Sequence, residues 1–421
     1  MQIQIDYTKL PDNKVICADA KSFFATVEIV SRGLDPMKTM LAVVGDLSRR
    51  GSVVLASSHA LKERYQIKTG SRLFEIPNDR NIHVVQARMG LYIDQSMKIL
   101  EIVNRFAPIE AIQPYSIDEL FFTTLGTERL FGSTYDVAMS LKKTVYRELG
   151  LLLAVGIGPN KFLAKVILDN YGKKTGVSEI TYSQIQKTLW PLDIINIWGI
   201  GVRMQKRLNS MGIYKLGDIA KAPLANLKRQ FGVIGEQLYM HAWGVDLSPV
   251  FVDPLVEIRK GVGSGITLMR DYKKHEARTV IIELTDHLTA KLRRYKVAAY
   301  TVTLSLRYSH NVSLRSYHKA HTMYAANNLT SPFLDVLEKL LEQGTDAPIR
   351  HIGISFTNLV DESAIQLDLF DRERHMQQLR LSRTVDYITQ KYGSNAIYRA
   401  LSITAAGTWL DRGHKIGGHY E

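Results

Sequence analysis

The sequence is poor in cysteine, and its apolar residues form no long uninterrupted run. Among 421 residues the single cysteine, Cys17, cannot form a disulfide within the chain. Zinc-type spacings of cysteine and histidine are absent. The first fourteen residues include Asp6 and Asp12 instead of a basic start and an apolar core, so no signal peptide is expected. These absences exclude a disulfide scaffold and a membrane span, and they predict a reducing, cytoplasmic location.

Acidic residues are the scarcer charged class. The 54 Lys and Arg exceed the 41 Asp and Glu, which leaves a formal net charge of +13. In a folded chain this excess favours a polyanionic partner such as nucleic acid, with a well-solvated basic surface as the alternative. An anionic membrane surface is a third partner class, and nothing else in the sequence supports it. The length allows two to four domains.

Two segments place carboxylates where strands are expected to end. The apolar run 15–18 ends at Asp19, just before a helical pattern. Asp118 and Glu119 lie at the apex of a predicted hairpin. Neighbours on a regular strand point to opposite faces, so both can reach one site only at such a turn. Three carboxylates suit the divalent cations of nucleotidyl transfer, whereas an isolated Asp-Glu pair in a turn is more often solvated.

The remaining patterns predict separate structural regions. A basic subdomain is inserted early and contains a helix at 59–65, and glycine-broken short helices occupy 193–222. The last large segment alternates apolar and polar residues, which predicts a βαββαβ sheet domain. Its expected strands and helices are, in chain order, 261–268, 276–295, 301–307, 312–317, 334–341 and 352–356.

The segments CADAKSFFATVE (17–28) and YSIDELFF (115–122) resemble the two metal-binding motifs of Y-family DNA polymerases, closest to UmuC-type members. The resemblance covers nearly the whole chain. It implies an α+β multidomain right-hand fold and low-fidelity addition of deoxynucleotides opposite damaged template bases, as in SOS-type DNA repair. The implied regions are palm (1–30 and 83–180), fingers (31–82), helical thumb with a helix-hairpin-helix (181–245), linker (246–256), βαββαβ little finger (257–360) and C-terminal tail (361–421).

The resemblance also implies the metal ligands. Asp19 and Asp118 would bridge two Mg²⁺ ions, for which Mn²⁺ is the alternative. Glu119 would complete the ion at the primer hydroxyl. The backbone carbonyl of Ala20 would be a further ligand, and a carbonyl is indifferent to the side chain that this sequence carries there.

Five residues are expected at the incoming nucleotide. By resemblance, Phe24 is the steric gate, the ring that would clash with a ribose 2′-hydroxyl, and Phe23 faces the palm core. From the residues alone, both rings would be interpreted as core residues. His59 and Lys62 are three residues apart on a short helix and share a face that could grip the triphosphate, unless that face is simply solvated. Lys165 matches a family lysine that contacts the same phosphates.

The segment Ile197-Trp198-Gly199-Ile200-Gly201 fits a helix-hairpin-helix, with a plain helix C-cap as the alternative. In such a motif, Gly199 and Gly201 let backbone N–H groups approach DNA phosphates. Other expected contacts with the DNA backbone are basic: Arg203, Lys206, Arg207, Arg259, Lys260, Arg307 and Arg315.

A peptide near the C-terminus resembles the motif by which bacterial polymerases dock on the sliding clamp. Its docking residues would be Gln366, Leu367, Leu369 and Phe370, which would fill an apolar pocket of the clamp. An edge strand or amphipathic core segment is the alternative. The 51 residues that follow could bind an accessory protein.

Two rival functions remain from the sequence. A palm-fold nucleotidyl cyclase would use similar carboxylates but needs neither the helix-hairpin-helix nor the clamp peptide. A catalytically inactive DNA-binding accessory protein would not need all three carboxylates.

Overall fold

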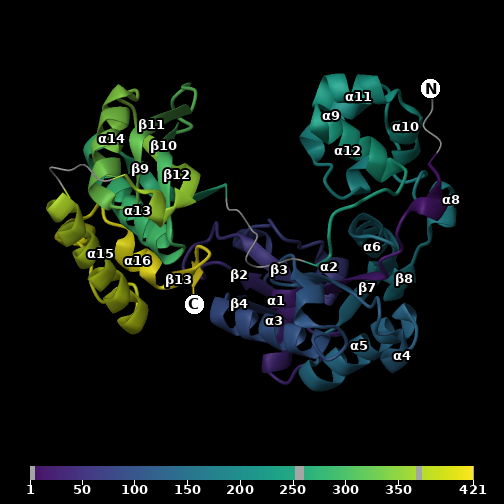
Figure 1. Ribbon diagram of the computed structural model, residues 1–421. Coiled ribbons are helices and arrows are strands. Elements are labelled where there is room, and N and C mark those ends of the chain that lie inside the picture. Colours follow the sequence, from purple (N-terminus) through teal and green to yellow (C-terminus); the bar gives the residue numbers. More distant parts are fainter. Residues whose placement is uncertain (1–4, 252–259, 367–371, 421) are drawn as a thin grey trace. The chain divides into compact units, whose positions relative to one another are not determined.

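The computed structural model describes residues 5–251, 260–366 and 372–420 (Figure 1). The chain forms two compact units, one of residues 1–256 with 419–421 and the other of residues 257–418. In the described part of the chain, no helix is long and apolar enough to cross a membrane.

A five-stranded sheet is the centre of the first unit. Its order is β5-β6-β1-β7-β8, and all neighbours are antiparallel except the parallel pair β7 and β8. Helices α5 and α6 both contact β1 and β7 and lie on either side of β7 in Figure 1, so the central strands are buried almost throughout. The strands are β1 (Val15–Ala20), β5 (Ile112–Pro114), β6 (Glu119–Thr123), β7 (Leu153–Gly158) and β8 (Val177–Glu179).

Six helices belong to the same part of the unit, and α5, α6 and α7 contact the sheet. A π-helical turn, η4 (Leu168–Gly172), joins two of them, α6 and α7, into one continuous segment. The helices are α1 (Phe23–Ser31), α3 (Met89–Val103), α4 (Glu128–Phe131), α5 (Thr134–Leu149), α6 (Lys161–Ile167) and α7 (Lys173–Thr175).

The inserted subdomain has its own sheet of order β3-β2-β4, in which β2 and β3 are antiparallel and β2 and β4 parallel. The predicted helix at 59–65 is confirmed as α2. The expected boundary at residue 83 falls inside β4, because β4 pairs with β2. Its elements are β2 (Met40–Val44), β3 (Val54–Ser57), α2 (His59–Tyr65) and β4 (Ile82–Gln86).

Short helices follow in the same unit and enclose a core of isoleucine and leucine side chains, among them Ile219 and Leu227. They are α8 (Ile185–Thr188), α9 (Val202–Asn209), α10 (Leu216–Lys221), α11 (Leu224–Phe231) and α12 (Val233–Ala242).

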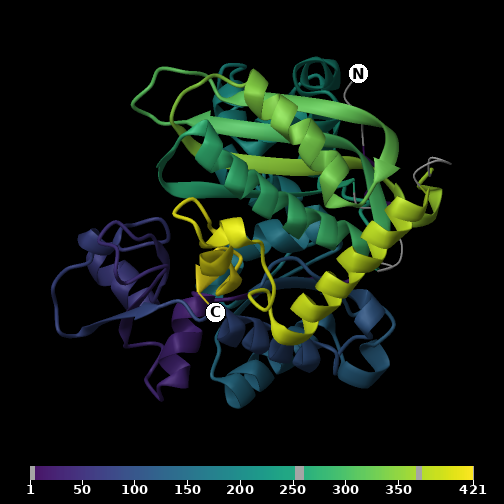
Figure 2. The same ribbon diagram turned by 90° about the vertical axis from the view of Figure 1, so that its left-hand side faces the viewer.

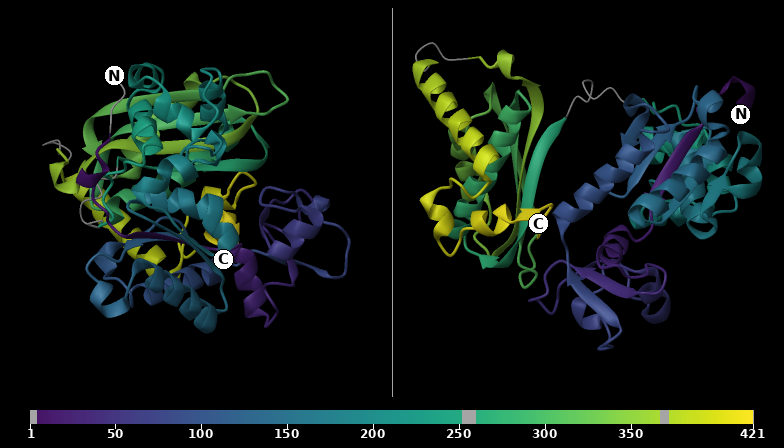
Figure 3. Two further views of the ribbon diagram at one scale, coloured as in Figure 1. Left: turned by 90° about the vertical axis from the view of Figure 1, so that its right-hand side faces the viewer. Right: turned by 90° about the horizontal axis from the view of Figure 1, so that it is seen from below.

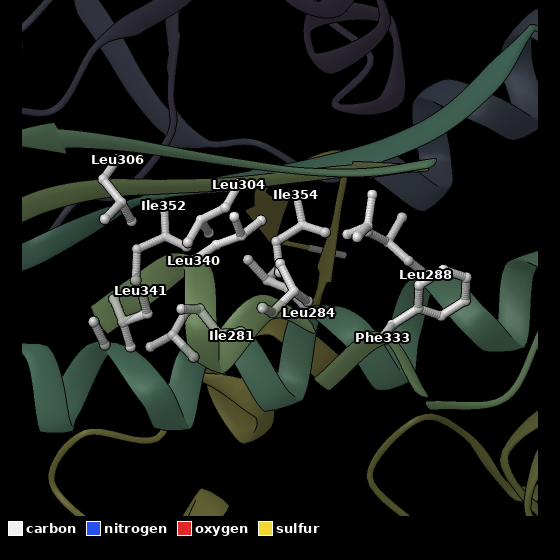
Figure 4. Packing of buried hydrophobic residues seen from close by; sticks show 14 of the residues in the cluster. Ile281, Leu284, Leu288, Leu304, Leu306, Phe333, Leu340, Leu341, Ile352 and Ile354 are labelled. Carbon is white, nitrogen blue, oxygen red and sulfur yellow. The ribbon is translucent and has the colours of Figure 1, made fainter. Parts of the chain in front are cut away.

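The second unit confirms the predicted βαββαβ order. Its antiparallel sheet has the order β11-β10-β12-β9, and alternate residues of β10 and β12, such as Leu304 and Ile354, pack against α13 and α14 (Figure 4). The elements are β9 (Gly261–Tyr272), α13 (Lys274–Arg294), β10 (Val297–Tyr308), β11 (Tyr317–Asn327), α14 (Thr330–Gln343) and β12 (Ile349–Asp361).

The prediction of a strand at 312–317 is wrong. Val312 donates its backbone N–H to Ser309 and Leu314 donates to Val312, so these residues form a turn. Leu314 is 45% exposed, so the apparent alternation has no buried face. The strand β11 begins only at Tyr317, and Arg315 lies in the preceding loop instead of on the sheet.

The C-terminal segment packs on the helical layer of the second unit. Helix α15 contacts α13 and lies on the far side of α13 from the sheet (Figures 2 and 3). The buried Arg293 of α13 donates to both carboxylate oxygens of Asp386 at 2.7 and 2.9 Å. Buried Glu283 accepts hydrogen bonds from Thr408. The elements are α15 (Arg372–Tyr392), α16 (Trp409–Gly413), β13 (Lys415–Ile416) and β14 (His419–Tyr420).

Candidate active site

The ends of β1 and β6 bring two predicted carboxylates together. Asp19 and Glu119 are directly paired across the two antiparallel strands, so their side chains lie on the same face of the sheet. Glu119 is buried and also accepts a hydrogen bond from the Cys17 thiol, whose sulfur lies 3.2 Å from Oε1. Burial and the nearby Glu119 carboxylate raise the pKa of Cys17, so the thiol stays protonated.

The third carboxylate, Asp118, lies in the bend before β6. Its backbone carbonyl accepts the N–H of Ala20 at 2.9 Å, which fixes the hairpin apex against the end of β1. Its side chain accepts a hydrogen bond from Ser116 Oγ at 2.7 Å and is therefore engaged within its own turn. Within the described residues, no group of three histidine, cysteine or carboxylate side chains is close enough to hold a metal ion. The structure thus joins Asp19 and Glu119 and leaves Asp118 beside them.

Two lysines lie against these carboxylates. Lys165 Nζ is 2.6 Å from Glu119 Oε1, and Lys173 Nζ is 3.0 Å from Asp19 Oδ2. Both ammonium groups also contact Asp169 Oδ1, at 3.0 and 2.9 Å. Burial lowers the pKa of each lysine, but the contacts with the carboxylates outweigh burial and raise it, so both remain charged. The carboxylates of Asp19 and Glu119 are therefore already paired with positively charged lysine side chains.

Asp169 and Lys173 were missed by the sequence interpretation, although a signal was present. Lys165, Asp169 and Lys173 are spaced four residues apart, the spacing that places side chains on one helix face. The spacing cannot show that this face is turned toward β1, which comes from the packing of α6 on the sheet.

The helix after β1 turns its first two rings in different directions. Phe23 is buried, as expected for a core residue, whereas Phe24 is partly exposed. The Phe24 ring stacks on Tyr92 with centroids 4.3 Å apart, and the Tyr92 hydroxyl donates to Glu28 Oε1 at 2.8 Å. Arg88 donates to the same buried carboxylate at 2.6 Å. A hydrogen-bonded network around the buried Glu28 carboxylate, which sequence interpretation also missed, therefore supports the ring of Phe24.

Lys62 and His59 of α2, both predicted to contact the triphosphate, have different partners in the structure. Lys62 Nζ donates to Ser22 Oγ at 2.8 Å and so reaches the turn between β1 and α1. Burial lowers the pKa of Lys62, and the charge of Asp19 opposes that effect. The exposed imidazole of His59 is instead 3.1 Å from Glu63 on its own helix. Only Lys62 is brought to the carboxylates.

The helix-hairpin-helix segment presents its glycines to open space. Gly199 has a φ of +91°, which favours glycine, and a Cβ added at Gly199 or Gly201 would meet no atom within 4 Å. Arg203 and Lys206 of α9 are exposed. Arg207, by contrast, stacks over Phe231 with 4.4 Å between its guanidinium carbon and the ring centroid.

The other predicted DNA contacts are on the second unit. Lys260 is exposed just before β9, and exposed Arg307 lies on β10 opposite His351. Arg259 lies outside the described residues. Within the clamp-type peptide, Gln366 is exposed; Leu367, Leu369 and Phe370 lie outside the described residues.

Comparison with known proteins gives consistent matches along the chain. Residues 18–169 match the impB/mucB/samB family, residues 259–369 match the C-terminal domain of that family, and residues 196–246 match the DNA polymerase-iota thumb domain. The chain is 38% identical to UvrX of Bacillus subtilis (strain 168) over 99% of both chains. It is 34% identical to DNA polymerase IV 2 of the same organism, over 98% of this chain and 100% of that protein.

A solved Y-family DNA polymerase chimera of Dbh and Dpo4 has the same fold, with a TM-score of 0.66 at 23% identity over 82% of this chain and 99% of that one. The matching family domains and relatives, together with the shared fold, define a template-directed nucleotidyltransferase of the right-hand type. The chain belongs to the Y family of DNA polymerases. It is a translesion DNA-directed DNA polymerase, whose family uses primer-template DNA, deoxynucleoside triphosphates and divalent metal ions.

Proposed function

We propose that Asp19, Asp118 and Glu119 are the catalytic carboxylates and hold two Mg²⁺ ions, with the Ala20 carbonyl as a further ligand. The observation that carries this proposal is the pairing of Asp19 with Glu119, each in contact with a lysine ammonium. Hard carboxylate oxygens suit Mg²⁺, and Mn²⁺ can replace it. When bound, the ions would activate the primer hydroxyl and neutralise the leaving pyrophosphate.

The protein's own side chains supply the rest of the chemistry. Asp118 would leave Ser116 and turn toward the metal ligands, a rotation of one partly exposed, hydrogen-bonded side chain. Lys62 and Lys165 would bind the triphosphate oxygens because both ammonium groups already lie beside the carboxylates. His59 is a weaker candidate, since it contacts Glu63.

Sugar selection would depend on Phe24, backed by Tyr92, while Phe23 anchors the helix in the core. A ribose 2′-hydroxyl would then meet the aromatic ring. Removing the ring would open the space without disturbing the metal ligands.

DNA would be held by its backbone. Gly199 and Gly201 leave their N–H groups accessible to a phosphate. The further contacts that we propose on this track are Arg203, Lys206, Arg259, Lys260, Arg307 and Arg315.

The clamp-type peptide, Gln366, Leu367, Leu369 and Phe370, is proposed to dock on the bacterial sliding clamp. It follows β12, the last strand of the four-stranded sheet, far in sequence from every proposed catalytic residue. An accessory protein at the tail and a cytoplasmic location complete the proposal.

Primer extension on undamaged and damaged templates tests the assignment of the carboxylates. Asp118→Ala and Glu119→Ala should each abolish nucleotide addition while DNA affinity changes little, because the metals serve the chemistry and the basic track serves affinity. Arg203→Ala is the matched control, which should weaken DNA binding and leave addition at saturating DNA intact. Normal extension by either carboxylate variant would refute the assignment.

A further inference from the structure

Three aromatic rings join the helix-hairpin-helix segment to the strand that carries Glu119. Trp198 immediately precedes Gly199, Tyr115 follows β5 in the bend before β6, and Phe121 is on β6. The ring centroids are 5.6 Å apart for Trp198 and Tyr115, 5.7 Å for Tyr115 and Phe121, and 5.9 Å for Phe121 and Trp198. The indole N–H of Trp198 also donates to the Tyr115 hydroxyl at 3.2 Å.

Tyr115 and Phe121 are both held to Glu119. The backbone N–H of Tyr115 donates to the Glu119 carbonyl at 2.9 Å. Phe121 is two residues beyond Glu119 on the same strand, so the two side chains lie on one face of the sheet. Phe121 is buried, and Trp198 packs against the cluster that contains it. Because a packed interior transmits small displacements, the position of Trp198 affects the segment on either side of Glu119.

The other side of Trp198 faces the proposed DNA contact. A phosphate bound by the N–H groups of Gly199 and Gly201 would restrict the backbone next to the indole ring. The hydrogen bond from Trp198 to Tyr115 is not part of a buried core, since Tyr115 is 51% exposed and Trp198 partly exposed. It is therefore a contact that DNA can strengthen by holding the segment in place.

We propose that Trp198 is a positioning residue through which DNA binding organises the metal carboxylates. When a DNA phosphate binds at the neighbouring glycines, Trp198 is held against Tyr115 and fixes the hairpin that carries Glu119. The inference rests on the proposed metal site and on the proposed DNA contact of the two glycines. Metal and DNA then strengthen each other's binding, and linkage requires the same factor in both directions.

Mn²⁺ binding, measured by electron paramagnetic resonance of the free ion with and without saturating primer-template DNA, tests the coupling without catalysis. The Mn²⁺ that DNA binds alone is subtracted. The gain in Mn²⁺ affinity on adding DNA should be about fivefold smaller in Tyr115→Phe than in the wild type, because the ring stays and one hydrogen bond is lost. The gain in DNA affinity on adding Mn²⁺ should shrink by the same factor. A residue that only stabilises the fold would not lower both gains equally while each ligand alone binds normally.

Two further variants and a control sharpen the test. Trp198→Phe removes the donor of the same hydrogen bond and should have the same effect as Tyr115→Phe. The double variant should lose no more than either single variant, because both substitutions remove one shared interaction. Trp190→Phe is the matched control, since its indole N–H donates to the Ala242 carbonyl at 2.9 Å among the same short helices. It should leave both gains as in the wild type.

The outcomes separate this inference from the proposed function. Wild-type gains in Tyr115→Phe and Trp198→Phe, with normal melting temperatures, would overturn the positioning role and leave the metal site and the DNA contact standing. Losses that multiply in the double variant would overturn it too, since the two residues would then act independently. Equal Mn²⁺ binding by the wild type and Asp19→Ala would overturn the metal site, and the role of Trp198 with it.

Discussion

The sheet around β1 and the four-stranded sheet of the second unit are both largely antiparallel, yet their faces differ in how tightly they are packed. In the first, α6 presses on β7 so closely that a Cβ on Gly156 would lie 2.1 Å from the carbonyl oxygen of Ala164. In the second, one face of β10 and β12 forms the core, and the other carries small residues such as Thr303 and Ser305. A Cβ on Gly353 of that face would meet nothing closer than 3.6 Å.

The difference fits the two tasks that we propose for these sheets. If Asp19, Glu119 and Lys165 act on reacting atoms, they must be held still, and the tightly packed sheet fixes all three by ion pairs and buries Glu119 and Lys165. A DNA backbone is long and is bound irrespective of sequence, so a face of small hydroxyl-bearing residues permits close approach without a fixed geometry. Substitutions should therefore have unequal effects on the two sheets.

The largest contrast is expected between two glycine-to-alanine substitutions. Gly156→Ala should destabilise the first unit by about 3 kcal/mol, because the added methyl meets backbone atoms of α6 that cannot move independently. Gly353→Ala should change stability by less than about 0.5 kcal/mol. Denaturant unfolding of both variants measures the difference, and similar midpoints would show that the two sheets are packed alike.

A smaller contrast is expected between two carboxylates. Glu28 is fully buried and accepts hydrogen bonds from buried Tyr92 and from the partly exposed Arg32 and Arg88. Glu338, by contrast, pairs with Arg278 at the surface. At pH 7, Glu28→Gln should cost about 2 kcal/mol, since hydrogen bonds to a charged group are lost, and Glu338→Gln at most about 0.5 kcal/mol.

The pH dependence of the Glu28 effect has a defined sign. Burial raises the pKa of Glu28, but its hydrogen bonds with Arg88, Arg32 and Tyr92 prevail and bring the folded pKa below the ordinary value of 4.5. Its stabilising contribution is therefore present above about pH 4.5 and disappears as the pH falls through the lower folded value. Unfolding of the wild type and of Glu28→Gln should converge in acid, and a gap that stayed constant with pH would show that packing, not charge, is lost.

The sequence predicted what local patterns determine. The start of β1 and the bounds of α2 followed from apolar runs and turn residues, although β1 continues to Ala20, past the apolar run 15–18. The hairpin before Glu119 followed from the strand-like runs on either side. Arg315 was wrongly placed on a strand because Val312 and Leu314 mimic a period of two. The true strand, β11, has mostly exposed residues, so its apolar pattern is too weak to identify it.

The site was predictable in part, for a related reason. Carboxylates at predicted strand ends can be recognised in the sequence, and this pattern identified Asp19, Asp118 and Glu119 as candidates without the structure. The partners of those carboxylates depend on how helices lie across the sheet. Asp169 in η4, Lys173 in α7 and Tyr92 in α3 are placed by the packing of their helices. Local spacing shows which residues share a helix face, but not that the face is turned toward the carboxylates.

The smallest expected effect concerns one exposed ring on each unit. Phe24 is partly exposed and is fixed by stacking on Tyr92, whereas Tyr324 is 97% exposed on β11. If the first unit positions groups rigidly for chemistry, Phe24→Ala should raise the ratio of ribonucleotide to deoxynucleotide incorporation by about tenfold, the usual size of a lost steric contact in a binding pocket. Tyr324→Ala, which removes a comparable ring, should leave the ratio unchanged.

Single-nucleotide extension with each nucleotide measures the ratio, and melting temperatures exclude unfolding. An unchanged ratio in Phe24→Ala with normal deoxynucleotide use would assign Phe24 to the core, and the gate would have to be sought in a residue that the packing of α1 and α3 supports less firmly.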